Sequence, residues 1–326
     1  MALGAFVSVG KSLGEAIERV RHADELGYES AYVTHIAGRD SLSVLMAYAG
    51  ATERIRLGTG VLPLYSRTPV ATAQQAATID EHSGGRMVLG VGISHQVTVE
   101  HWYQAKIERP LVAMREYVSI LRALFRGEEP PQGEIFRTQF RFTGFQPRAD
   151  LPIYIAALSP RMLRLAGEIA DGVMLWLCVP RYIESVVVPN VQAGRERAGK
   201  TMEGFDIVAA VPSAVTGHVE EAYSTMRSDL ITYFNLPFYR AMIERSGFAE
   251  DIAKFDAGMQ AGDLDGARAG ISKEFLDELT AVGTGENVRE GIQRYLSAGA
   301  TSPCIGPVPR TDFNATLDAA APGRQP

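Results

Sequence analysis

Short runs of apolar residues alternate along the chain with longer segments in which apolar residues recur at helical spacing. Each run is five to seven residues long, and the eight runs lie at residues 3–8, 30–34, 55–61, 86–92, 152–158, 172–177, 205–211 and 302–308. A run that is apolar throughout is typical of a parallel strand buried on both faces, because a solvent-facing side would give strict alternation. The pattern therefore predicts eight parallel β-strands.

Helices are predicted between these strands, where start and stop signals bracket the periodic segments. Gly27 ends the first helix, and Pro69 and Pro160 stand near first turns, where proline is tolerated. The predicted helices cover residues 12–27, 41–52, 69–84, 111–126, 160–170, 183–199 and 286–300. Residues 216–282 are mostly helical with no predicted strand, and alternation over residues 135–147 predicts an inserted β-hairpin.

Strands that alternate with helices in this way predict an α/β fold, a (β/α)8 TIM barrel with a helical insertion between strands 7 and 8. Residues 1–326 would then form one domain. The rival fold is an open, doubly wound sheet, which normally carries a GxGxxG motif after its first strand. Here the first strand runs into SVGKSLGE, and the later stretches GTGVLP and GVGISH keep only the first two glycines. The barrel is therefore favoured.

Composition and charge exclude several classes of protein. The chain has 326 residues, 46% of them hydrophobic, and its net charge of −6 without a basic patch argues against nucleic-acid binding. No apolar stretch reaches the roughly 20 residues of a membrane span, and no signal peptide is recognisable. Cys178 and Cys304 are far apart and predict buried free thiols. We expect a cytoplasmic protein that acts on a small molecule.

The carboxyl ends of the strands are where a barrel of this kind places its active site. His35 is the one histidine at the end of a predicted strand, and it is either a general acid or base or a hydrogen-bonded structural imidazole. Other residues at or near strand ends are Ser8, Thr34, Gly60, Val61, Gly92, Ser94, Ala157, Leu158, Ser159 and Trp176. Histidines and carboxylates do not cluster there, so no metal site is predicted.

Small residues are concentrated at three strand ends. Four glycines, Gly58, Gly60, Gly90 and Gly92, either leave room for a flat ring or allow close packing of strand against helix. After the fifth strand, the helix that begins at Pro160 is either an anion site made of backbone amides or a plain helix capped by Ser159. The residues alone leave both alternatives open.

Three stretches together resemble a known family. RIRLGTGVLPLYSRTP, SGGRMVLGVG and PIYIAALSPRMLRLAGEIADGVML are similar to the bacterial luciferase-like oxidoreductases, and the similarity runs from the first strand to the last. Within the family the chain most resembles the branch that uses the deazaflavin coenzyme F420, which includes methylene-tetrahydromethanopterin reductase and F420-dependent glucose-6-phosphate dehydrogenase. The resemblance implies hydride transfer between coenzyme F420 and a small organic substrate.

The resemblance also implies roles for particular residues. His35 would face the deazaflavin ring, with Thr34 in place of the aspartate of the relatives, and the Gly60–Val61 peptide would be cis in a bulge behind the ring. The implied cofactor-binding residues are Thr34, Gly60, Val61, Leu62, Gly92, Ile93, Ser94, Ala156, Ala157, Leu158 and Ser159. The sugar-phosphate lysines of the glucose-6-phosphate enzyme have no recognisable counterpart, which argues against a sugar-phosphate substrate.

Two other functions remain open for this fold. One is an FMN-dependent two-component monooxygenase, and the other is a non-catalytic flavin-binding barrel. The substrate pocket is expected between the loop after His35, Trp176 and the aromatic-rich residues 234–239. The relatives further imply a homodimer.

Overall fold

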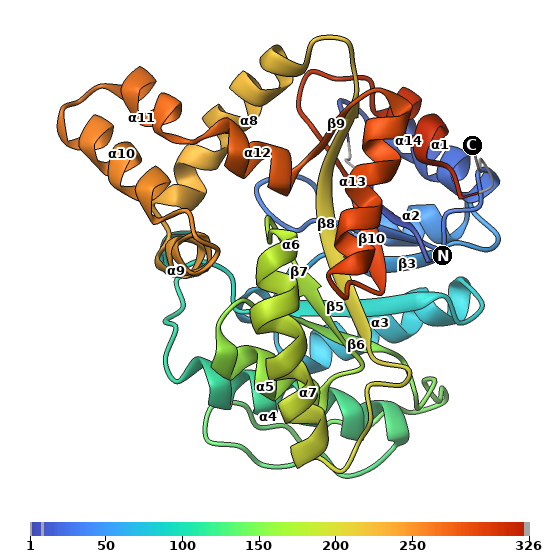
Figure 1. Cartoon of the computed structure of the whole chain (residues 1–326). Coiled ribbons are helices and arrows are strands. Elements are labelled where there is room, and N and C mark those ends of the chain that lie inside the picture. Colours follow the sequence, from blue (N-terminus) through green and yellow to red (C-terminus); the bar gives the residue numbers. More distant parts are fainter. Residues whose placement is uncertain (1, 8–9, 323–326) are drawn as a thin grey trace.

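A closed barrel of eight parallel strands forms the centre of the molecule (Figure 1). The computed structural model describes residues 2–7 and 10–322, so the expected strand end at Ser8 lies outside the described residues. The strands are β1 (Gly4–Phe6), β2 (Ser30–Val33), β3 (Arg56–Thr59) with β4 (Leu62–Pro63), β5 (Met87–Gly92), β6 (Ile153–Ala156), β7 (Gly172–Leu175), β8 (Asp206–Val215) and β10 (Ser302–Pro307). Neighbours along the chain pair in order, and β10 pairs with both β1 and β8, which closes the barrel. The predicted TIM barrel is confirmed.

The third strand of the barrel is interrupted by a bulge. β3 pairs with β5 through Gly58 and Val88, and β4 pairs with it through Leu62 and Val91. Four positions separate the first and last of these on β3–β4, against three on β5, so one residue is extra. The peptide bond between Gly60 and Val61 in this bulge is cis, as the resemblance implied.

Helices surround the barrel and return the chain from each strand to the next. They are α1 (Leu13–Glu25), α2 (Ser41–Ala49), α3 (Pro69–His82), α4 (Pro110–Arg126), α5 (Pro160–Ile169), α6 (Pro180–Tyr182), α7 (Val188–Arg197), α13 (Gly285–Ser297) and, after the last strand, α14 (Phe313–Ala320). Side chains cap several of them at the N-terminus, including Ser12, Thr68 and Thr284. A π-helical segment at Ile183–Val187 joins α6 to α7, so the proline of this region falls in the first turn of α7.

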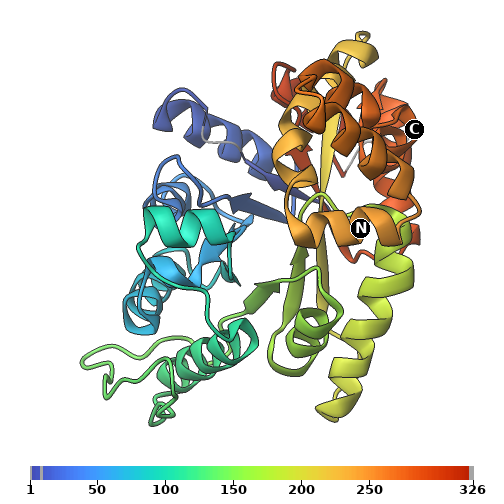
Figure 2. The same ribbon diagram turned by 90° about the vertical axis from the view of Figure 1, so that its left-hand side faces the viewer.

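The predicted helical insertion follows β8 and is confirmed. Five helices, α8 (Val219–Phe234), α9 (Pro237–Arg245), α10 (Ala249–Gln260), α11 (Leu264–Gly270) and α12 (Lys273–Leu279), gather beside the barrel (Figures 1 and 2). A short strand, β9 (Ala281–Gly283), ends this block and extends the sheet by pairing with the end of β8. The expectation of no strand in residues 216–282 is wrong at its end, because a strand of three residues is too short to give a periodic signal.

The predicted β-hairpin at residues 135–147 is wrong, because this segment is an irregular loop. The Glu116 carboxylate on α4 accepts hydrogen bonds from the three consecutive backbone N–H groups of residues 134–136, at 2.8, 2.9 and 3.0 Å. Those groups are therefore satisfied by a side chain and not by a second strand. The alternating phenylalanines pack inward instead, as Phe136 does edge-on against Tyr117 with ring centroids 5.3 Å apart.

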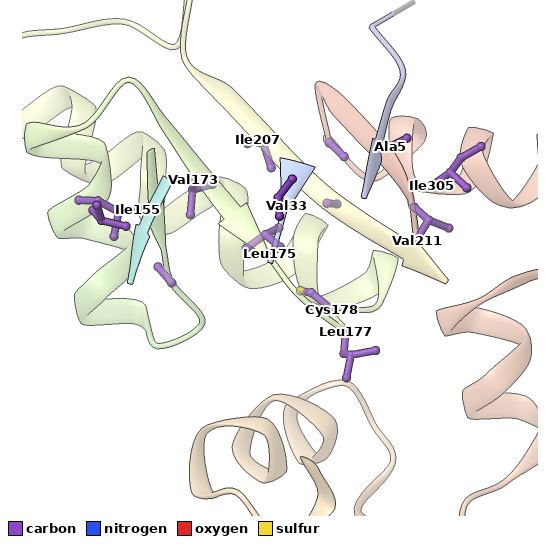
Figure 3. Close-up of a cluster of buried hydrophobic side chains, with 14 of the residues drawn as sticks. Ala5, Val33, Ile155, Val173, Leu175, Leu177, Cys178, Ile207, Val211 and Ile305 are labelled. Carbon is purple, nitrogen blue, oxygen red and sulfur yellow. The ribbon is translucent and has the colours of Figure 1, made fainter. Parts of the chain in front are cut away.

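The strands bury one set of side chains against the helices and another inside the barrel. Figure 3 shows part of the outer set, which includes Ile155, Val173 and Ile207. The inner set consists of Phe6, Tyr32, Val88, Tyr154, Met174, Val208, Ala210 and Cys304. Val61 and Trp176 pack on this inner set and are only partly buried. They therefore mark the boundary between the filled barrel and its open mouth.

The two cysteines are both buried and free, as predicted. Burial raises the pKa of each thiol well above its usual value. Both side chains are therefore packing residues. In the described part of the chain, no helix combines the length and the apolar character that crossing a membrane requires.

Candidate active site

The end of β2 lies directly beside the bulge of β3–β4. The backbone N–H of Gly60 donates to the carbonyl of Val33 at 2.9 Å. This bond places Thr34 and His35, which follow β2, next to Gly60 and Val61. The side chain of His35 is 10% exposed. The structure thus brings together four of the residues that the resemblance assigned to the cofactor ring.

Residues from the next two strands complete this side of the mouth. A Cβ added at Gly92, the last residue of β5, would lie 2.6 Å from Val61 Cγ2 and 3.2 Å from Ala156 Cβ. Val61, Gly92 and Ala156 therefore meet across three adjacent strands. The side chain of Leu62 is fully buried in the outer core, so only its backbone can reach the mouth.

The structure decides between the two interpretations of the glycines for three of the four. A Cβ at Gly58 would lie 2.5 Å from the Tyr32 ring, and one at Gly60 would lie 2.5 Å from the Phe6 ring. At Gly90 the corresponding space is filled by a backbone carbonyl and a methionine sulfur. The space on the side-chain side of these glycines is filled by the barrel interior, so a ligand ring could contact only their backbone. Close packing is therefore correct, although the glycines face interior side chains and not a helix.

The N-terminus of α5 carries unpaired backbone donors. Ser159 caps the helix through its Oγ, which accepts from the N–H of Met162 at 3.3 Å. The carbonyl of Leu158 accepts from the Tyr182 hydroxyl at 2.8 Å, which holds the loop in place. In the described part of the chain, the N–H groups of Leu158 and Ser159 have no hydrogen-bond partner. Free donors and a helix N-terminus together favour an anion here.

His35 is held at the opposite side of the mouth by the N-terminus of α2. Its Nδ1 lies 3.0 Å from Ser41 Oγ and accepts from the backbone N–H of Ser41 at 3.3 Å. Asp40 Oδ2 lies 3.8 Å from the same nitrogen and forms an ion pair with Arg67. Burial lowers the pKa of His35, the Arg67 guanidinium lowers it further, and Asp40 acts in the opposite direction. The net effect of these surroundings favours the neutral imidazole.

A cavity of about 310 Å³ opens beside Trp176, between the ends of β7, β8 and β10 and helix α8. Its walls are mostly apolar. The Nε1–H of Trp176 donates to the Tyr233 hydroxyl at 3.0 Å, which joins the barrel to the insertion. Asp229 is the one carboxylate among the lining residues, and burial raises its pKa, against the influence of Arg310. The cavity suits a small, largely apolar molecule.

His95, just past β5, was not predicted as a site residue, but its ring lies among aromatic side chains of the insertion. Its centroid is 6.4 Å from that of Tyr233 and 6.0 Å from that of Tyr239. Burial lowers the pKa of His95. The preceding Ser94 has a left-handed φ of 68°, which turns the chain after Ile93. The aromatic-rich stretch at residues 234–239 was the only sequence feature that pointed to this contact. Nothing in the local sequence links that stretch to the loop of His95, more than a hundred residues earlier.

Comparison with known proteins identifies the family. A profile described as luciferase-like monooxygenase matches residues 1–302. The chain belongs to this family. It is 34% identical over 298 residues to 5,10-methylenetetrahydromethanopterin reductase of Archaeoglobus fulgidus, covering 88% of this chain and 87% of the relative. It is 30% identical over 306 residues to a putative coenzyme F420-dependent oxidoreductase of Mycobacterium tuberculosis, covering 87% and 88%.

A solved structure shows the same fold. The coenzyme F420-dependent tetrahydromethanopterin reductase of Methanopyrus kandleri superposes with a TM-score of 0.79 at 23% identity, covering 98% of this chain and 97% of that chain. The family resemblance and the barrel predicted from the sequence are confirmed. The prediction that this luciferase-like chain is an enzyme, an oxidoreductase, is confirmed with them.

Proposed function

We propose that this luciferase-like protein is a coenzyme F420-dependent oxidoreductase that transfers hydride between the deazaflavin and a small organic substrate. The observation that carries the proposal is the similarity over most of the chain to relatives named for this chemistry. Coenzyme F420 supplies hydride transfer at one ring carbon when it is bound. The protein supplies the binding surface and the groups that act on the substrate.

The residues at the mouth fit a flat ring with an anionic tail. Val61, Gly92 and Ala156 meet without an intervening side chain and would contact the ring, together with Thr34, Gly60, Ile93 and the backbone of Leu62. The free N–H groups of Leu158 and Ser159 would bind phosphate. Ser94 and Ala157 would lie beside it, although the N–H of Ala157 already donates to the carbonyl of Met174 at 3.4 Å. These are the residues that the sequence resemblance proposed for the cofactor.

The substrate would lie between His35 and the cavity beside Trp176. His35 comes from β2 and Trp176 from the end of β7, so the two approach the mouth from opposite sides of the barrel. In this arrangement His35 acts on the reacting group, and the apolar cavity walls hold the rest of the substrate and exclude water. The size of the cavity favours a small substrate.

Titration of the purified protein with coenzyme F420 and with FMN tests the proposal. We expect tighter binding of the deazaflavin and turnover of a substrate from a panel. Ketones and methylene-tetrahydromethanopterin are tested with reduced coenzyme, and secondary alcohols with oxidised coenzyme. Preferred binding of FMN, with oxygen consumed by the reduced complex, would replace the proposal with a monooxygenase. Binding without turnover of any substrate or consumption of oxygen would favour a non-catalytic barrel.

The remaining expectations concern assembly and location. We propose that the protein works as a cytoplasmic homodimer whose 326 residues fold as a single domain. Light scattering at micromolar concentration measures the mass directly. A mass of 35.4 kDa, that of one chain, would contradict the dimer.

Replacing Ser159 with aspartate should weaken coenzyme F420 binding about tenfold or more, since the new carboxylate would repel the anionic tail, and tenfold corresponds to about 1.4 kcal/mol. Aspartate is also a good N-cap, so the helix should be retained. Ser272→Asp provides a matched control, because Ser272 caps α12 in the same way, through Phe275 at 3.1 Å. Equal affinity in the two variants would mean that the tail binds elsewhere.

A further inference from the structure

The hydrogen bonds of His35 define which of its nitrogens carries the proton. A backbone N–H can only donate, so the 3.3 Å bond from Ser41 requires a lone pair on Nδ1. The neutral ring therefore carries its proton on Nε2. Among the described residues, no group bonds to Nε2. His35 thus presents an unused N–H donor on the ring edge away from α2.

Protonation of Nδ1 is opposed by its surroundings. It would break the bond from Ser41 and would place a cation against the first turn of α2, where the helix dipole is positive. Two charged side chains of the described residues act on the ring: Asp40, at the start of α2, and Arg67, from the segment before α3. Their charges are opposite, so the Arg67–Asp40 ion pair cancels most of the attraction that Asp40 alone would exert on an imidazolium.

Both members of this pair are held in place. The Asp40 carboxylate accepts from the backbone N–H and the hydroxyl of Ser43 at 2.8 and 2.9 Å. The carbonyl of Arg67 accepts from the Tyr117 hydroxyl at 3.2 Å, and its guanidinium donates to Ser66 Oγ at 3.3 Å. The pair is therefore a fixed part of the wall behind His35 and not a mobile surface contact.

We propose that Asp40 and Arg67 are positioning residues. Arg67 favours the neutral ring of His35, and its ion pair with Asp40 offsets the attraction that Asp40 alone would exert on an imidazolium, so that His35 serves the reaction as a hydrogen-bond donor through Nε2 and not as an imidazolium acid. With coenzyme F420 bound, the oxygen of a substrate carbonyl would gain negative charge as its carbon receives hydride, and Nε2–H would donate to that oxygen. Water would supply the proton that completes the alcohol, and the hydroxide left behind would take up the proton that the reduced coenzyme releases together with its hydride. The part of this inference that concerns the reaction rests on the proposed function. The part that concerns the tautomer and charge of His35 does not.

NMR of the full chain labelled at its histidines, without cofactor, tests the state of the ring. The signal of His35 is assigned by its loss in His35→Ala. We expect the Nε2–H tautomer and a pKa below 6.5 in the native protein. Arg67→Met should raise the pKa of His35, because Asp40 then acts alone, and Asp40→Asn should lower it. Arg67→Lys keeps the positive charge, so the pKa of His35 should stay lowered in this variant, as in the native protein.

Shifts of the His35 pKa in opposite directions in Arg67→Met and Asp40→Asn would support the proposal. If the two residues were merely structural, the direction of the shift would not depend on which charge is removed. Shifts in the same direction, no shift in either variant, or an Nδ1–H tautomer would overturn it. If Arg67→Met does not fold, Asp40→Asn and Arg67→Lys still test the direction of the pKa shift of His35. Asp40→Asn should fold, because asparagine keeps the helix cap.

The pH dependence of turnover separates this proposal from the proposed function. Since the neutral ring is the active form, the native enzyme should keep its activity as pH falls through 6.5, the usual pKa of histidine. Arg67→Met should lose activity at a higher pH than the native enzyme. Shifts seen by NMR with an unchanged turnover profile would support the control of His35 by the pair and would remove His35 from the reaction.

Discussion

Replacing His35 with alanine should lower turnover about a hundredfold or more, because the variant loses the donor that stabilises charge on the substrate oxygen. Binding of coenzyme F420 should stay within a few-fold of native, since the surface proposed to contact the ring consists of Val61, Gly92 and Ala156. The fold should be retained, because the side chain of His35 reaches solvent, so water can enter the space it leaves and bond to the buried N–H of Ser41. Steady-state kinetics with the substrate found in the panel, and calorimetric titration with the cofactor, measure both quantities.

His22→Ala is the matched control for this experiment. His22 is also a hydrogen-bonded imidazole, with Nε2 at 2.9 Å from Asp318 Oδ1, but it lies in the last turn of α1, at the opposite end of the barrel from the strand ends. Its removal should leave turnover unchanged. A His35→Ala protein with a lower melting temperature and native turnover per folded molecule would show that His35 is structural, which is the alternative that the sequence left open.

Replacing Gly90 with alanine should destabilise the barrel by about 3 kcal/mol, the upper part of the usual range for overpacking. A Cβ at this position would lie 2.1 Å from the carbonyl oxygen of Thr59 and 2.6 Å from Met174 Sδ. The methionine side chain can move, but the carbonyl belongs to the backbone of β3 and cannot move without disturbing the sheet. Denaturant unfolding, followed by circular dichroism, measures the loss.

The control for this prediction is Gly217→Ala. No atom lies within 4 Å of a Cβ at Gly217, and its φ is not in the left-handed region. Its free energy of unfolding should change by no more than about 0.5 kcal/mol. If Gly90→Ala were as stable as Gly217→Ala and bound the deazaflavin less tightly, the glycine would serve the cofactor and not the packing.

The sequence determined the strands and most of the helices of this protein. A parallel strand inside a barrel is covered on both faces, so its residues must be apolar in succession, and eight such runs were visible without any tertiary information. The cap at Ser159 acts within four residues of chain and could be predicted in the same way. The candidate site could be placed at the strand ends because the barrel geometry fixes where they meet.

Tertiary structure alone decided the features that depend on distant partners. Residues 135–147 alternate like a hairpin but form a loop, whose first two N–H groups donate to the Glu116 carboxylate on a helix earlier in the chain. The glycines turned out to accommodate Tyr32 and Phe6. The Arg67–Asp40 pair behind His35 joins residues 27 positions apart. The local sequence determines the secondary-structure preference of a segment. Its close packing and ion pairs depend on which distant residues the fold places next to it.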